Sequence, residues 1–121
     1  MAYKILVVED NLDCREMLTA LLETEGFNVL TAGSGNAGID IAEAECPDLI
    51  ITDISMPDLD GIEMTKRLRQ HPKFSNVPVI VLTAFGDIDR EWAIKAGASR
   101  FMTKPFEFVS LTIAIKHLLS L

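Results

Sequence analysis

The feature that most constrains the fold of this chain is a series of five short apolar segments spread along its length. Each is rich in β-branched residues, and three of them are apolar almost without interruption. Strands buried on both faces of a parallel sheet have this pattern, whereas strands with one solvated face alternate between apolar and polar residues. The segments predict five β-strands, which are KILVV (4–8), FNVLTA (27–32), DLIIT (48–52), VPVIVLT (77–83) and SRFMT (99–103).

Between the predicted strands lie segments with the apolar spacing of amphipathic helices. In residues 13–25 the apolar side chains fall at offsets 0, 3, 4, 7 and 8 from Cys14. Gly26 then stands where a glycine commonly ends a helix. The other predicted helices cover residues 36–46, 60–70, 87–96 and 107–120.

Regular alternation of strands and helices is typical of an α/β fold in which helices cover both faces of a parallel sheet. We expect a doubly wound (βα)5 arrangement, with the five-stranded sheet in the flavodoxin-like order 2-1-3-4-5. The sequence contains no linker, repeat or low-complexity segment. We therefore predict that residues 1–121 form a single domain.

The composition argues against several classes of protein. The apolar runs are too short to span a bilayer and the first residues lack a signal-peptide pattern, so we expect no membrane segment. A net charge of −7 argues against direct binding of nucleic acid, which depends on neutralisation of phosphates by Lys and Arg. Cys14 and Cys46 lack the spacing of a metal or redox motif, which favours a reducing, cytoplasmic location.

One motif points to a different function. The glycines of TAGSGNAG (31–38) have the spacing G-x-G-x-x-G after a predicted strand, and Asp53 follows at about the distance of a ribose-binding acid. The predicted strand order, however, places this loop at the edge of the sheet, away from the crevice where a dinucleotide would bind. We interpret the stretch as a turn at Gly33 and an N-cap at Ser34, followed by a helix that its glycines weaken.

Polar residues follow four of the predicted strands, and the C-terminal ends of parallel strands all meet at one edge of a sheet. Glu9 and Asp10 follow the first strand, Asp53 the third, Thr83 the fourth and Lys104 the fifth. The first and third strands are neighbours in the order 2-1-3-4-5. We therefore expect the three acids to crowd together, with the threonine and the lysine beside them.

This set of side chains favours phosphoryl transfer. Three carboxylates in close proximity repel one another, and a hard divalent cation such as Mg²⁺ relieves that repulsion. Lys104 adds a positive charge suited to a phosphoryl group, and Thr83 adds a hydroxyl donor. A carboxylate nucleophile, a metal and a lysine are together the elements of phosphoryl transfer. Each residue alone has an ordinary role, such as a helix cap or a surface charge.

Four segments resemble the motifs of the receiver domains of two-component response regulators, the CheY-like superfamily. They are KILVVEDN (4–11), DLIITDISMPDLDGIE (48–63), VPVIVLTA (77–84) and AGASRFMTKPF (96–106). The resemblance extends over essentially the whole chain. It implies a phosphorylation-dependent signalling module whose phosphoryl donor is a sensor histidine kinase or a histidine phosphotransfer protein.

The resemblance also implies a role for each acid of the predicted site. Asp53 would be the phosphoacceptor. Asp10, Asp53 and the backbone carbonyl of Ser55 would ligate Mg²⁺, for which Mn²⁺ can substitute. Glu9 would support the metal through a water molecule.

The remaining site residues would bind the phosphoryl group and transmit its presence. Lys104 would contact the phosphoryl oxygens, and its bond to Pro105 would be cis. Thr83 would move onto the phosphoryl group and Phe101 would turn inward behind it. This movement would change the face made by the fourth helix, fifth strand and fifth helix, where an output partner would bind. Gly61 would serve the turn into the third helix.

Two alternatives remain open. A phosphohydrolase of the aspartyl-phosphate type usually has a second acid two residues after its nucleophile, where this chain has Ser55. A receiver-like interaction module that is never phosphorylated would be expected to lack some of these groups. As an enzyme, the chain would catalyse only its own phosphorylation and dephosphorylation. Ser55 and Phe85 occupy positions that vary in the family and would tune the lifetime of the acyl phosphate.

Two aromatic residues are candidate contacts for partners. Trp92 lies on the predicted fourth helix, and an exposed tryptophan beside the switch face would anchor an output protein. Phe106, just after Lys104 and Pro105, would pack on a helix of the kinase. The ordinary interpretation of both residues is packing within this chain.

Overall fold

Strands and helices alternate along the computed structural model, which describes residues 2–84 and 87–121. The strands are β1 (Lys4–Val8), β2 (Asn28–Ala32), β3 (Leu49–Asp53), β4 (Val79–Thr83) and β5 (Arg100–Thr103). The helices are α1 (Leu12–Thr24), α2 (Gly35–Glu45), α3 (Gly61–Gln70), α4 (Asp87–Ala96) and α5 (Phe108–Leu118), with a short 3₁₀ helix η1 (Pro72–Phe74) after α3.

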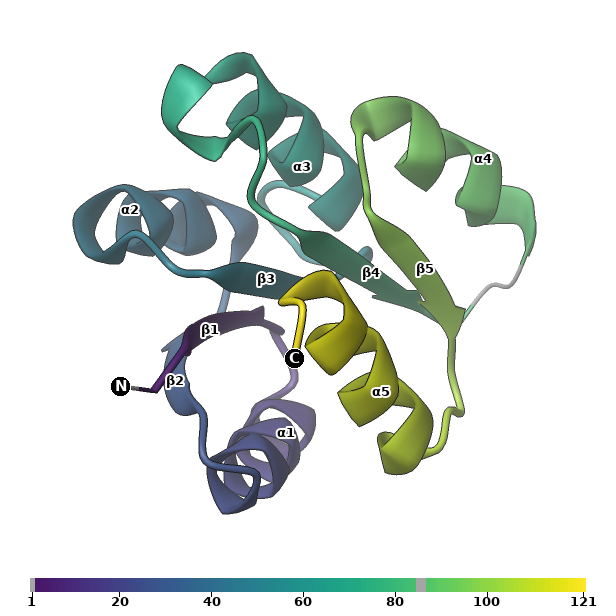
Figure 1. Ribbon diagram of the computed structural model, residues 1–121. Coiled ribbons are helices and arrows are strands. Elements are labelled where there is room, and N and C mark those ends of the chain that lie inside the picture. The colour runs from purple at the N-terminus through teal and green to yellow at the C-terminus, as the bar shows by residue number, and fades with distance from the viewer. Residues whose placement is uncertain (1, 85–86) are drawn as a thin grey trace.

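The five strands form one parallel sheet in the order β2-β1-β3-β4-β5, which confirms the predicted fold class and topology. Helices α1 and α5 cover one face of the sheet, and α2, α3 and α4 cover the other (Figure 1). The strand order reverses at β1, between β2 and β3. The carboxyl ends of β1 and β3 therefore lie side by side, at the place where ligands usually bind in such sheets.

The central strands are buried on both faces, as their continuous apolar sequences predict. In β1, Ile5 and Val7 pack in the cluster under α1 and α5, whereas Leu6 and Val8 pack in the cluster under α2, α3 and α4. All four side chains have no exposed surface. A side-chain period of two residues thus places apolar groups on both faces of the strand.

The ends of the helices follow local sequence signals. Asn11 and Asp60 cap α1 and α3 by accepting hydrogen bonds from the amides of Cys14 and Glu63. Gly26 and Gly97 follow α1 and α4 with positive φ angles of 91° and 105°, a conformation that costs glycine little.

Some boundaries differ from the prediction by one or two residues. Helix α5 ends at Leu118 rather than residue 120, and α2 ends at Glu45. The residue after α2, Cys46, takes the left-handed conformation with φ of 50° without being glycine. The 3₁₀ helix η1 was not predicted, because a single turn carries no amphipathic pattern. No helix in the described ranges is both long and apolar enough to cross a membrane.

Candidate functional site

Three carboxylates meet at the C-terminal ends of β1 and β3. Glu9, Asp10 and Asp53 each place one oxygen within 4.8 Å of the other two. Val8 of β1 pairs with Thr52 of β3. Glu9 and Asp53 are the residues that follow them in the sequence, so the pairing places their carboxylates side by side. Glu9 is buried, Asp53 is half-buried and Asp10 is exposed. The sheet therefore brings together the three acids that the sequence predicts at this edge.

The carboxylate of Asp53 is held on both sides. Its Oδ1 accepts a hydrogen bond of 2.8 Å from the Ile54 amide, and its Oδ2 lies 3.3 Å from Nζ of Lys104. The side chain is 13% exposed, so it can be reached from solvent but is largely enclosed. Gly61 approaches the backbone carbonyl of Asp53 so closely that a Cβ atom would collide with it. The glycine thus allows α3 to begin directly behind the site.

The ammonium of Lys104 bridges two of the acids. Its Nζ lies 3.3 Å from Asp53 Oδ2 and 3.5 Å from Glu9 Oε2. Burial acts to lower the pKa of Lys104, but the charges of Asp53 and then Glu9 outweigh burial, and its pKa is raised. The backbone amide of Lys104 donates to the carbonyl of Thr83, which ties the site to the end of β4. The peptide bond from Lys104 to Pro105 is cis.

The ionised form of Glu9 is disfavoured by its surroundings. Its side chain is 3% exposed, and its pKa is raised first by burial and second by the neighbouring charge of Asp53. Lys104 and the amide of Asn11, which donates to Oε1, oppose this rise without cancelling it. The cluster thus holds three carboxylates, and the one ammonium beside it pairs with two of them. A further positive charge beside them would be favourable.

The donor set fits a magnesium ion. The three acids offer hard oxygen ligands close enough to share one cation, which is the chemistry that Mg²⁺ prefers. Ser55 and Asp60 line a hollow beside Asp10, so the loop after β3 borders the acids on their solvent side. The buried Glu9, with its raised pKa, is the signature of an acidic site that a cation would relieve.

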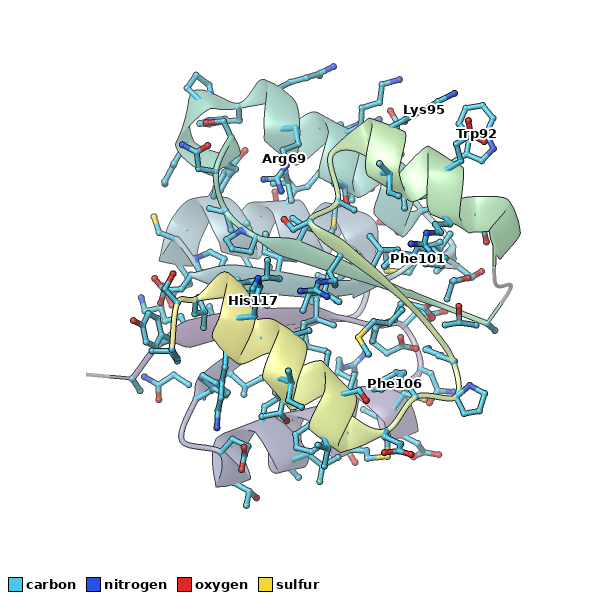
Figure 2. All side chains as sticks on the ribbon, turned by 45° about the vertical axis from the view of Figure 1, so that its right-hand side comes forward. Arg69, Trp92, Lys95, Phe101, Phe106 and His117 are labelled. Carbon is cyan, nitrogen blue, oxygen red and sulfur yellow. The ribbon has the colours of Figure 1, made fainter. Side chains whose placement is uncertain are left out.

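Thr83 and Phe101 lie on the neighbouring strands β4 and β5, and Thr83 is the last residue of its strand. Thr83 is buried and donates a hydrogen bond of 3.3 Å to Asp89 Oδ2 on α4. Phe101 is half-buried and packs against the apolar cluster under α2, α3 and α4, beneath α4 (Figure 2). Phe85, which the sequence suggested as a tuner of acyl-phosphate lifetime, lies outside the described residues.

An apolar groove runs beside Lys104 on the face covered by α1 and α5. It lies between α1 and the segment that joins β5 to α5, and Phe106 is among its lining residues (Figure 2). The groove encloses about 380 Å³ and is lined by Cys14, Met17, Leu18, Leu21, Lys104, Pro105, Phe106 and Phe108. The sequence indicated Phe106 alone, because a groove between two distant segments leaves no local pattern.

Sequence reasoning missed two acids that the structure places beside the predicted residues. Asp89 accepts from Thr83, and Asp58 binds the first amides of α2. Aspartate in a loop or a first helical turn is common, so neither residue stood out. The signal that could have found Asp58 is the absence of an acidic residue in the first turn of α2.

Comparison with known proteins decides the family. The family model of the response regulator receiver domain matches residues 5–116. The chain belongs to the response-regulator receiver-domain family. It is 43% identical over 117 residues to a transcriptional regulatory protein CpxR homolog of Haemophilus influenzae, covering 96% of this chain and 50% of that protein.

Two other similar proteins show how the chain compares in length and structure. It is 36% identical to Protein PilH of Pseudomonas aeruginosa, over 97% of this chain and 98% of that protein. The receiver domain of a Pseudomonas aeruginosa sensor histidine kinase has 30% identity and a TM-score of 0.92 over the full length of both chains. That crystal structure has a magnesium ion coordinated in its active-site cleft. The chain spans about half the length of several curated relatives that it matches.

Proposed function

We propose that this receiver domain accepts a phosphoryl group on Asp53, from a phosphohistidine of a sensor histidine kinase or a histidine phosphotransfer protein. The observation that carries the proposal is the position of the Asp53 carboxylate. It lies between the Ile54 amide and the Lys104 ammonium, and within 4.8 Å of two further acids. A half-buried carboxylate beside a lysine and a cation site is suited to act as a nucleophile toward phosphorus.

In the transfer, a carboxylate oxygen of Asp53 attacks the phosphorus atom of the donor. A new O–P bond forms, the N–P bond breaks, and its electron pair returns to the imidazole nitrogen. The Lys104 ammonium, 3.3 Å from Asp53, stabilises the negative charge of the transferring oxygens. The Ile54 amide holds Oδ1 of Asp53, which fixes the orientation of the carboxylate.

Asp10, Asp53 and the Ser55 carbonyl would hold Mg²⁺, and Glu9 would act through water. The ion would neutralise charge on the phosphoryl oxygens and help to orient them. Mn²⁺ has the same preference for oxygen ligands and would substitute. The receiver domain of the Pseudomonas kinase, with magnesium in its active-site cleft, supports this assignment.

The apolar groove beside Lys104 is the proposed docking site of the donor. A phosphohistidine must come within bonding distance of Asp53, and Lys104 borders both the acids and the groove. An amphipathic helix carrying the histidine would bury apolar side chains against Met17 and Phe106. A Met17→Lys variant should keep phosphorylation by acetyl phosphate and lose most transfer from a phosphorylated kinase that reacts with the wild type.

Phosphorylation would change the face made by α4, β5 and α5. In the proposed switch, Thr83 leaves Asp89 to bind the phosphoryl group, and Phe101 turns inward behind it. Trp92 lies on the outer side of α4, is 62% exposed, and has Lys95 5.6 Å from the centre of its ring (Figure 2). An exposed tryptophan is a strong anchor for a protein partner. The output partner would be a further domain or a separate protein.

Intact-mass measurement tests the phosphoacceptor. With Mg²⁺ and acetyl phosphate, the wild type should gain the mass of one phosphoryl group, and addition of EDTA should prevent the gain. Asp53→Asn should gain none, whereas Asp40→Asn, which changes an exposed aspartate on α2, should behave as the wild type. An undiminished gain in Asp53→Asn would exclude Asp53 as the acceptor.

A further inference from the structure

The loop from β3 to α3 is fastened to the start of α2 by one carboxylate. Asp58 Oδ1 accepts a hydrogen bond of 3.1 Å from the Gly35 amide, and Oδ2 accepts one of 3.0 Å from the Asn36 amide. Oδ1 also accepts from the amide of Leu59 at 2.7 Å. These bonds join residues 22 and 23 positions apart in the sequence, so they connect two segments that no strand pairing links.

Two further observations show that this contact is built into both segments. The first turn of α2 has no acidic residue of its own, so Asp58 supplies the negative charge that a helix N-terminus favours. Gly35 approaches the backbone of Leu59 so closely that a Cβ atom would collide with its carbonyl oxygen. The pKa of Asp58 lies below its usual value, chiefly because the Asn36 amide donates to its carboxylate.

The same loop carries Ser55, whose carbonyl is a proposed magnesium ligand. At its start the loop is tied to α3, since the Gly61 amide donates to the Ile54 carbonyl at 2.9 Å. Asp58 ties its other half to α2. Ser55 lies between these two attachments, next to the first and three residues from the second. Its position relative to Asp10 and Asp53 therefore depends on both.

We propose that Asp58 is a positioning residue for magnesium, because its carboxylate fixes the β3–α3 loop, and with it the Ser55 carbonyl, to the first turn of α2. The inference rests on the proposed magnesium site and adds to it a residue that touches neither the metal nor the phosphoryl group. It also gives a role to the glycine-rich stretch at residues 33–38. Its amides bind the carboxylate of Asp58, as the amides of a dinucleotide-binding loop bind phosphates.

Calorimetric titration of the full chain with MgCl₂ tests the inference. Loss of a group that orients a metal ligand typically weakens metal binding by about 10- to 100-fold, and we expect about tenfold for Asp58→Ala. Asp58→Asn keeps one acceptor oxygen, so its affinity should lie between those of Asp58→Ala and the wild type. Ser34→Ala is the matched control. It removes the other cap of the same helix, the bond from the Ala37 amide, and leaves the Asp58 bonds in place.

Hydrogen exchange gives a second measurement, because a residue that only caps a helix would not make amide protection depend on Mg²⁺. Because coupling between two sites is reciprocal, Mg²⁺ should increase the protection of the Gly35 and Asn36 amides in the wild type and not in Asp58→Ala. Equal Mg²⁺ affinity in Asp58→Ala and the wild type would overturn the inference and leave the proposed function intact. Failure of the wild type itself to bind Mg²⁺ would instead overturn the magnesium site.

Discussion

Thr83 donates a hydrogen bond of 3.3 Å to Asp89, and this bond links the end of β4 to the first half of α4. Thr83 is the residue that the proposed switch moves toward the phosphoryl group, and α4 belongs to the face that would carry the signal. Asp89 and a bound phosphoryl group would therefore compete for the same hydroxyl. The competition gives α4 a direct physical connection to the state of Asp53.

Removing the acceptor should favour the phosphorylated conformation. Thr83 must give up its bond to Asp89 when it moves, and a hydrogen bond of this kind contributes about 0.5–1.5 kcal/mol. Asp89→Ala should therefore bind the phosphoryl mimic beryllofluoride about two- to tenfold more tightly in the presence of Mg²⁺. Binding can be followed by the fluorescence of Trp92, which lies on α4 and is the single tryptophan of the chain.

Glu91→Ala is the control for this experiment. Glu91 lies on the same helix, is exposed, and forms an ion pair of 3.4 Å with Lys95 that faces solvent. Its loss should leave beryllofluoride affinity unchanged. Unchanged or weaker affinity in Asp89→Ala would show that the bond does not restrain the switch.

The raised pKa of Glu9 leads to a pH-dependent prediction. A carboxyl whose folded-state pKa exceeds its ordinary value of 4.5 destabilises the fold when it is charged. Without metal at pH 7, Glu9→Gln should be more stable than the wild type by about 1 kcal/mol, since it removes a buried charge that Lys104 only partly compensates. The advantage should vanish as the pH falls toward 4.5, because the folded wild type then takes up a proton.

Urea denaturation in EDTA at pH 7 and pH 4.5 measures this difference. Glu16→Gln, a change at an exposed position of α1, should have no comparable effect at either pH. Mg²⁺ should reverse the order at pH 7, because the cation stabilises the charged wild type. A Glu9→Gln protein that is less stable than the wild type in EDTA at pH 7 would contradict the prediction.

Lys104 should have opposite effects on stability and on metal binding. Lys104→Met leaves Glu9 and Asp53 without their cation, so we expect a loss of about 1–2 kcal/mol in unfolding free energy in EDTA. The same substitution removes a competing positive charge, so Mg²⁺ should bind more tightly and restore much of the loss. Phosphorylation by acetyl phosphate should nevertheless be slower, since the phosphoryl oxygens lose their lysine.

Denaturation with and without Mg²⁺ tests both effects together. Lys116→Met serves as the control. Lys116 is exposed, lies near the end of α5, and forms an ion pair of 3.6 Å with Glu25, the residue after α1. Weaker Mg²⁺ binding in Lys104→Met would mean that the lysine supports the metal site instead of competing with it.

The sheet and the gathering of the acids could be predicted because they depend on short-range signals and a general rule. The continuous apolar sequence of β1 predicts burial on both faces, and parallel strands place Glu9, Asp10 and Asp53 at one edge. The strand order then follows from the common doubly wound topologies. The order β2-β1-β3-β4-β5 is therefore accessible without coordinates.

The side-chain contacts that tie neighbouring elements together could not be predicted in the same way. The bonds of Asp58 to α2 and of Thr83 to Asp89 depend on tertiary distances that no local pattern encodes. The glycines of α2 are a clearer case. Glycine weakens a helix, so the sequence alone predicts that α2 is among the helices least protected in hydrogen exchange. The structure adds a packing reason for each, since Gly35 meets Leu59 and Gly38 meets Val8.

Gly38→Ala separates helix propensity from packing. Propensity alone predicts that the substitution stabilises α2 by about 1 kcal/mol. A Cβ atom at this position, however, would lie 2.9 Å from Cγ2 of Val8 and 3.1 Å from Sδ of Met64. The Met64 side chain can adjust, but Val8 is fully buried on β1 and has little freedom to move. Overpacking of this kind costs about 1–3 kcal/mol, so Gly38→Ala should be less stable than the wild type in urea denaturation.

Ala44→Gly, at an exposed position of the same helix, is the control and should lose about 1 kcal/mol through propensity alone. A Gly38→Ala protein more stable than the wild type would show that the contact between α2 and β1 relaxes at little cost.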